Sequence, residues 1–162
     1  MNFVNRLNKC SDFSCIFELV KSAVESTIKK RRVGLMLGLS DLPLHIGALH
    51  QLGSNFIIMN KILLEKIVNL DNKKLTNAYI FHVLLHEYLH SLGCVNEQET
   101  QNLTYLISEK ILGPDHQATL IAKYGIGAIF AGMSRFDYQE PEKFGGIEII
   151  QDFEDDNLDY FG

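Results

Sequence analysis

Apolar residues recur at two different spacings along the chain, and the spacings separate predicted helices from predicted strands. Residues 13–31 place large apolar side chains three and four positions apart, which predicts an amphipathic helix: Phe13, Phe17, Val20, Val24 and Ile28. Ser11 or Asp12 precedes them as a candidate N-cap. Residues 33–59 instead contain short apolar runs separated by glycine, proline and serine, which indicate a small sheet with a hairpin-like turn near residues 53–55.

Residues 60–124 repeat the helical spacing in four segments, residues 60–68, 76–92, 97–112 and 114–124. Residues 76–92 are apolar on nearly every side, which is typical of a helix buried in a core. Gly93 is suited to end this helix and Asn96 to begin the next, whereas residues 125–136 fit either a last helix or a packed loop. The pattern predicts an α+β domain in which a small, mostly antiparallel sheet packs on the buried helix and several further helices.

The predicted buried helix carries the sequence His-Glu-x-x-His. His86 and His90 are four residues apart, so their side chains lie one above the other on one helix face and can bind the same zinc ion. Glu87 projects about 100° away from His86, where its carboxylate can take a proton from a metal-bound water. Zinc lowers the pKa of such a water from 15.7 toward about 7, so the motif indicates metal-dependent hydrolysis. The alternative is a core helix whose histidines have ordinary hydrogen-bond partners.

A catalytic zinc ion usually has three protein ligands, so a third ligand is expected outside the motif. The helix predicted at 97–112 must return beside the buried helix, because the connection after the buried helix is short. Glu97 and Glu99 both lie near its start. If Leu103 and Leu106 mark its buried side, Glu99 lies on that side, four residues before Leu103. We therefore expect Glu99 to be the third ligand, with Glu97 as the alternative.

Residues 86–100, HEYLHSLGCVNEQET, resemble the gluzincin metallopeptidases, in which the motif supplies two histidines and a downstream helix supplies a glutamate. The segment is most similar to the small archaeal minigluzincins, single-domain proteins in which that glutamate can follow the second histidine after only eight residues. This spacing also implies that Glu99 is the third zinc ligand. The resemblance implies a zincin-like fold, a Zn²⁺ cofactor and a peptide or protein substrate.

The resemblance covers about residues 33–112 and has implications for neighbouring segments. The run IGALHQLGSNFIIMN stands where gluzincins have an upper-rim strand that holds the substrate extended. A downstream His, Tyr or Arg stabilises the oxyanion in that family, and the candidates here are His116, Tyr124 and Arg135. On this basis Glu87 is the general base of a metalloendopeptidase.

Three other residues near the motif have competing interpretations. Asn96 stands where the metzincin pattern HExxHxxGxxH has its third ligand, and Met133 could imitate the methionine turn of that family, but asparagine is a weak zinc ligand. His82 shares the face of His86 and is expected to be a core histidine, with a supporting role behind the ligands as the alternative. Cys94 is expected to be a small buried apolar residue.

Charge is unevenly distributed along the 162 residues, whose formal net charge is −5. Residues 137–162 contain nine acidic residues against one lysine, a net charge of −8, whereas residues 1–136 contain 14 basic and 11 acidic residues, a net charge of +3. We therefore divide the chain into a metallopeptidase domain at 1–136 and an acidic tail at 137–162. The overall charge disfavours nucleic acid as a partner, and no apolar stretch is long enough to span a membrane.

The acidic tail suggests an alternative function as a latent or noncatalytic zinc-binding protein. Its only strand-like piece, IEII at 147–150, could lie along the sheet edge and bring a carboxylate to the zinc ion, as in a zymogen. The competing expectation is a solvated acidic tail.

The cysteines and the N-terminal residues bear on location. Cys10, Cys15 and Cys94 are odd in number and lack the spacing of a secreted disulfide framework. The N-terminal residues contain no apolar core of a signal peptide. Both observations suit a cytoplasmic protein, and the sequence leaves the oligomeric state open.

Overall fold

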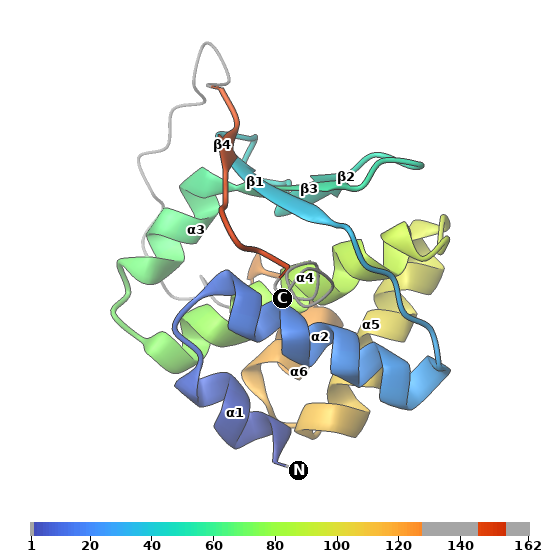
Figure 1. The fold of residues 1–162 in the computed structure, drawn as a ribbon. Helices are drawn as coiled ribbons and strands as arrows, with labels where there is room; N and C mark the ends of the chain where they lie inside the picture. Colours follow the sequence, from blue (N-terminus) through green and yellow to red (C-terminus); the bar gives the residue numbers. More distant parts are fainter. Residues whose placement is uncertain (1, 128–145, 155–162) are drawn as a thin grey trace.

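A computed structural model describes residues 2–127 and 146–154, which form an α+β fold (Figure 1). A small sheet lies over a layer of helices, and the coarse α+β prediction is confirmed. The described residues form six helices and four strands, in the order α1 (Phe3–Lys9), α2 (Phe13–Ile28), β1 (Met36–Ser40), β2 (Ala48–His50), β3 (Phe56–Asn60), α3 (Lys61–Val68), α4 (Lys73–Ser91), α5 (Glu97–Leu112), α6 (Gln117–Tyr124) and β4 (Glu148–Ile149).

The sheet is mixed, with strand order β2-β3-β1-β4. Both outer pairs are antiparallel, but the central pair of β1 and β3 is parallel, with Met36 opposite Phe56. The prediction of a mostly antiparallel sheet missed this central pair. The chain crosses from β1 to the far side of β3, forms β2 there, and returns as β3 alongside β1 in the same direction.

Asn60 holds the crossing loop between β1 and β2 in place. Its side-chain amide donates hydrogen bonds to the carbonyl oxygens of Leu42, Pro43 and Ile46 at 2.8–3.1 Å. Its side-chain oxygen accepts hydrogen bonds from the backbone N–H groups of Leu42 and Ile62. The bond from Ile62 also caps α3. This fully buried side chain therefore fixes the loop that leads into β2.

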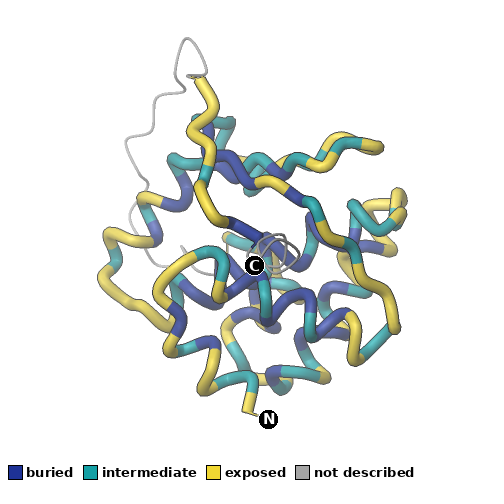
Figure 2. The backbone as a smooth tube through the Cα atoms, viewed as in Figure 1, coloured by how far each residue is buried: buried dark blue, intermediate teal, exposed yellow. Residues whose placement is uncertain are grey.

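Helix α4 lies at the centre of the molecule, between the sheet and the other helices (Figures 1 and 2). The alternating residues Leu37, Leu39, Ile57 and Met59 of β1 and β3 are buried, as expected for strands with one face on the core. The longest buried run is on α4 itself and includes Tyr79, Phe81, Leu84, Leu85 and Tyr88. Within the described ranges, no helix is long and apolar enough to cross a membrane.

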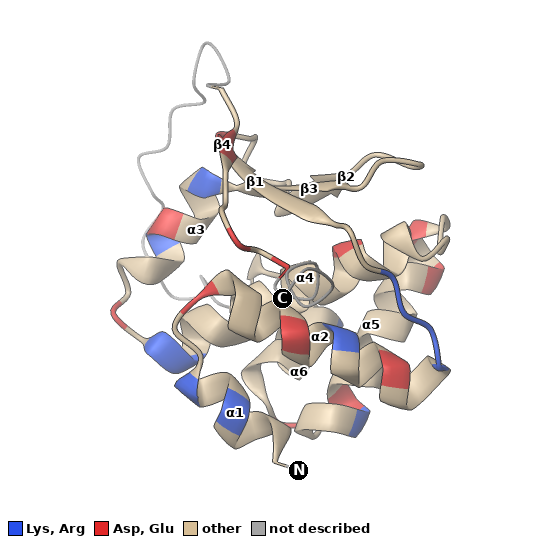
Figure 3. Cartoon of the chain, in the orientation of Figure 1, with Lys and Arg blue, Asp and Glu red and all other residues tan. Residues whose placement is uncertain are grey.

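Helix α2 ends at Ile28 and not at residue 31 as the spacing predicted, so the four basic residues 29–32 follow the helix (Figure 3). Helix α2 ends at Ile28 because Lys29 adopts a left-handed conformation with φ of 58°. The Arg32 guanidinium donates to the carbonyl oxygens of Ser91, at 2.7 Å, and Ser54, at 3.4 Å. Arg32 therefore satisfies a free carbonyl at the end of α4, which is a structural role for part of this run.

Residues 146–154 of the acidic segment are part of the fold. Strand β4 pairs with β1 at the sheet edge opposite β2. Phe153 stacks on Phe17 with ring centroids 4.4 Å apart, and the buried Glu154 pairs with Lys21. Phe153 and Glu154 are buried, whereas residues 146–149, 151 and 152 are exposed, and β4 lies at the sheet edge away from β2. The rest of the predicted tail, residues 137–145 and 155–162, lies outside the described residues.

No disulfide was expected from the cysteine spacing, but the structure joins Cys10 to Cys15. Cys10 caps the end of α1 and Cys15 lies in the first turn of α2, so the tight turn between the two helices brings their Cα atoms to 5.6 Å. Cys94 is a free cysteine. The argument for a reducing compartment from the cysteines is therefore weakened.

Candidate metal centre

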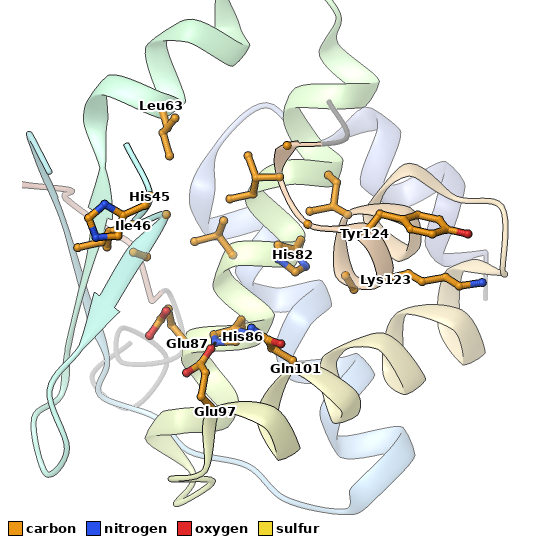
Figure 4. Close-up of a pocket in the computed structure, with 18 of the residues that line it drawn as sticks. His45, Ile46, Leu63, His82, His86, Glu87, Glu97, Gln101, Lys123 and Tyr124 are labelled. Carbon is orange, nitrogen blue, oxygen red and sulfur yellow. Dashed lines mark ion pairs between the residues drawn. The ribbon is translucent and has the colours of Figure 1, made fainter. Parts of the chain in front are cut away.

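The two histidines of the motif lie on the face of α4 that is turned toward β2 and α5, and Figure 4 shows His86 close to Glu97. Their ring centroids are 4.9 Å apart, one helical turn along α4. Asn72 caps the N-terminus of α4, since its side chain accepts a hydrogen bond from the Leu75 N–H, and α4 is buried over much of its length. A rigid, central helix therefore positions both imidazole rings.

Glu97 completes the group from the first residue of α5. Its Oε1 lies 2.7 Å from His86 Nε2, and its Oε2 lies 2.9 Å from His90 Nε2. Gly93, with a positive φ of 105°, follows the last turn of α4, and Asn96 caps α5, so the chain reverses within a few residues. Suitable ligand atoms of His86, His90 and Glu97 all lie within 4.8 Å of one another.

Glu99, the expected third ligand, is not part of this group. The expectation took Leu106 as a marker of the buried side of α5, but Leu106 is 58% exposed. The buried side is instead formed by Thr100, Thr104 and Ile107, which follow Glu97 at spacings of three, four and three residues. Glu97 therefore points to α4, and the exposed Glu99 has its backbone N–H bonded to the Asn96 cap.

The donor set and its spacing fit a zinc ion. Two imidazoles and one carboxylate form a ligand set typical of catalytic zinc, whose tetrahedral ligand atoms are about 3.3 Å apart. Glu97 contacts the two histidines through different oxygens, at 2.7 and 2.9 Å, and the ligand atoms lie within 4.8 Å of one another, so one ion would need a modest rearrangement of the three side chains. His90 Nδ1 lies 2.6 Å from the Cys94 carbonyl oxygen and donates to it, which leaves Nε2 free of its proton as a metal ligand.

Glu87 lies beside the three candidate ligands and is only 7% exposed. Burial raises its pKa to about 7, with the nearby Glu97 carboxylate adding to the rise and His90 opposing it. Burial likewise lowers the pKa of His86, although Glu97 partly opposes this. The site therefore holds a buried glutamate next to an imidazole whose neutral form is favoured by burial.

Two hollows meet at Glu87 and Glu97. The larger, of about 840 Å³, lies between the β2 side of the sheet and α6, and the smaller, of about 260 Å³, lies beneath Leu49 and Leu52. Strand β2 forms one wall of both and pairs only with β3 among the described strands. The arrangement gives an open cleft that runs past the candidate metal centre along an edge strand.

The other predicted residues have different outcomes. Asn96 uses its side-chain oxygen to cap α5, and His116 uses Nδ1 to accept the N–H of Ala118 at the start of α6. Tyr124 lines the larger hollow but is 65% exposed (Figure 4). Arg135 and Met133 lie outside the described residues. Of the three oxyanion candidates, the structure thus brings only Tyr124 to the wall of the cleft within the part that it describes.

Cys94 and His50 have roles at the site that the sequence did not predict. Cys94 is only half-buried; its carbonyl accepts from His90, and its Sγ accepts from the Thr100 hydroxyl at 3.1 Å. His50 on β2 lines the smaller hollow, and its Nε2 donates to the Ser54 carbonyl oxygen at 2.7 Å. The carbonyl contact could not be predicted from residue type, because every residue has a carbonyl group.

Comparisons with known proteins add nothing to the description of the site. A scan against protein-family models, a search of curated proteins and a search of solved structures each found no match. The case for a metal centre therefore depends on the converging side chains and on the motif that carries them.

Proposed function

We propose that this chain is a zinc-dependent peptidase of gluzincin type, in which His86, His90 and Glu97 hold the metal and Glu87 is the general base. The observation that carries the proposal is the convergence of three ligand atoms beside a buried glutamate on the floor of an open cleft. Two core histidines with ordinary partners would not need a carboxylate from a second helix placed between them.

The residues of the proposed centre have different roles in amide hydrolysis. A bound zinc ion supplies Lewis acidity that makes its water a nucleophile near neutral pH. Glu87 accepts the proton of that water and later delivers it to the leaving amine, which requires a carboxylate at the cleft floor. His90 is kept in the metal-binding tautomer by its hydrogen bond to the Cys94 carbonyl.

The cleft suits an extended peptide. The edge of β2 that no described strand pairs with offers backbone N–H and C=O groups next to Glu87, so a peptide can add to the sheet as a further strand. Such pairing would hold a main-chain carbonyl in place without demanding particular side chains. The exposed Leu49 and Leu52 at the smaller hollow provide apolar contacts for the residues on that side.

The proposal predicts zinc-dependent cleavage of a mixed peptide library by the full-length protein. Removing the metal with a chelator should abolish cleavage, and adding back one equivalent of zinc should restore it. Cleavage sites are read by mass spectrometry, with the Glu87→Gln variant purified in parallel to exclude a contaminating protease. Cleavage that persists in the chelated protein would contradict a metal-dependent mechanism.

The identity of the third ligand has its own prediction. Glu97→Ala should weaken zinc binding by more than the roughly 10- to 100-fold that loss of an outer-shell partner causes, because it removes one of the three proposed ligands. Glu99→Ala is the matched control, since this exposed glutamate lies two residues away on the same helix but outside the ligand group. Zinc affinity is measured by competition with a chromophoric chelator. Loss of affinity in the Glu99 variant alone would reassign the ligand.

A further inference from the structure

The hairpin of β2 and β3 forms one side of the smaller hollow, and the end of α4 and the start of α5 form the other. Leu49, His50 and Leu52 line the hollow from the hairpin, and Glu87, His90, Val95 and Glu97 line it from the helices. A peptide paired with β2 would therefore pass between the hairpin and the candidate metal centre. The distance of the hairpin from α4 determines how the backbone of that peptide lies relative to Glu87.

The tip of this hairpin, residues 51–55, has little packing of its own. Four of its five residues are exposed, with Leu52 at 67%, and Ser54 is half-buried. Segments with few buried contacts open readily unless hydrogen bonds hold them. The contacts between the hairpin tip and the body of the molecule therefore decide how firmly β2 is placed over the hollow.

Arg32 connects the hairpin tip to the end of α4. Its Nη1 donates to the Ser91 carbonyl oxygen at 2.7 Å, one of the last carbonyl groups of α4, which have no partner within the helix. Its Nη2 donates to the Ser54 carbonyl oxygen in the hairpin tip at 3.4 Å. His50 Nε2 donates to the same Ser54 oxygen at 2.7 Å. A single guanidinium thus links the helix that carries the metal-binding motif with the turn that follows β2.

Tyr88 fixes Arg32 itself. The Arg32 N–H donates to the Tyr88 hydroxyl at 2.8 Å, and that hydroxyl donates to the Arg32 carbonyl oxygen at 3.3 Å. Tyr88 is 0% exposed and packs edge-on against the Phe17 ring, with centroids 5.4 Å apart. It lies within the motif, between Glu87 and His90. Both the backbone and the side chain of Arg32 are therefore held by α4, which gives the guanidinium a defined place relative to the candidate metal centre.

We propose that Arg32 is a positioning residue of the cleft, which holds the hairpin of β2 and β3 at a fixed distance from α4 and so determines where the backbone of an extended substrate lies. The proposal rests on the proposed function, because it requires a substrate that pairs with β2. A planar guanidinium suits this role, since its N–H groups point in fixed directions and their hydrogen bonds are strengthened by its charge. Capping α4 would need only the bond to Ser91, whereas Arg32 also reaches across to the hairpin.

Hydrogen exchange of the full-length protein tests the contact without substrate or metal. In Arg32→Met, the slowly exchanging backbone N–H groups of residues 48–58 should exchange about tenfold faster than in the wild type, because the hairpin loses its connection to α4. Those in the interior of α4, residues 79–86, should be unchanged. Arg31→Met is the matched control, since the neighbouring Arg31 pairs with Glu25 on the surface, and it should leave the hairpin as in the wild type. Unchanged hairpin exchange in Arg32→Met overturns the proposal.

Steady-state kinetics separate positioning from a general loss of folding. On a peptide identified from the library, Arg32→Met should raise KM about tenfold and change kcat by less than about threefold, because the proposed ligands and Glu87 are untouched. A variant that merely folds less well would lose kcat through its smaller folded fraction, at constant KM. Arg32→Lys keeps the charge at the end of α4 but lacks the planar fork. It should therefore unfold at the same urea concentration as the wild type and still raise KM.

Shortening the peptide from each end in turn gives a second readout. In the wild type, removing the residues that lie along the hairpin should raise KM, whereas in Arg32→Met the same truncation should add little, because both changes remove one interaction. Wild-type cleavage with an unchanged KM in Arg32→Met and Arg32→Lys, or fully additive effects of truncation and substitution, overturns this proposal and leaves the proposed function standing. Absence of cleavage by the wild type instead overturns the proposed function, and this proposal with it.

Discussion

Replacing Glu87 by glutamine should lower the rate of peptide hydrolysis by a factor of about 10² to 10⁴ while zinc remains bound at one per chain. The amide has nearly the same shape as the carboxylate but cannot accept the proton of the attacking water. Glu87 is buried on the cleft floor and is not among the three converging ligands, so its loss should spare the metal. Rates are measured on a peptide identified from the library, and zinc by elemental analysis.

Glu99→Gln serves as the control, because it makes the same chemical change at an exposed glutamate near the site. Its rate and zinc content should both match the wild type. Full activity in the Glu87 variant would refute the assigned base, whereas loss of zinc together with activity would move Glu87 from the role of base to that of ligand.

The second large effect is expected at the buried ion pair of Lys21 and Glu154. Their side chains are 0% and 1% exposed, with Nζ and Oε2 3.3 Å apart, and Glu154 also accepts the Leu35 N–H at 2.7 Å. Removing one member leaves a buried charge with fewer partners, so Glu154→Leu should lower the free energy of unfolding by about 3 kcal/mol. Glu18, 2.7 Å from Lys21 but partly exposed, limits the loss. Urea denaturation provides the measurement.

A double variant and an exposed ion pair test whether burial causes the expected loss of stability. Lys21→Met with Glu154→Leu should recover most of the lost stability, since apolar side chains of similar size can replace a buried pair. The exposed pair of Arg31 and Glu25 is the control, and Arg31→Met should cost less than about 1 kcal/mol. If Glu154→Leu lowers the free energy of unfolding by no more than this control does, the buried ion pair does not anchor the acidic segment.

Much of the fold could be predicted because residues typical of helix ends stand where the helices begin and end. Asp12 and Asn96 cap α2 and α5 at the positions that the sequence indicated, and Gly93 follows α4. The apolar run on α4 predicted its burial, since a helix without a polar face has no other stable place. Each of these signals depends only on residues that are near one another in the sequence.

Features that depend on distant contacts were missed. The parallel pairing of β1 and β3 depends on the crossing loop that Asn60 holds, and the anchoring of the acidic segment depends on Lys21, 133 residues before Glu154. Charge alone suggested a separate tail, because a sum of charges does not reveal which acidic residue is buried.

The residues of the candidate site show the same division. His86, Glu87 and His90 follow from a spacing within one helix. Choosing between Glu97 and Glu99 required the buried face of α5, which carries Thr100 and Thr104 where leucines were expected to mark it. These hydroxyls donate to the backbone, Thr104 to the Thr100 carbonyl at 2.7 Å, so they are buried without penalty. Only the burial of Thr100 and Thr104, which the structure shows, places Glu97 on the side of α5 that faces α4.

Zinc K-edge X-ray absorption on the full-length protein, loaded with one equivalent of zinc, tests the central claim most directly. The proposed centre of His86, His90 and Glu97 predicts a first shell of nitrogen and oxygen only, with the outer-shell scattering of two imidazole rings. In Glu97→Ala the imidazole signal should persist at reduced affinity. A sulfur neighbour, which would implicate the free thiol of Cys94, or fewer than two imidazoles, would contradict the site described here.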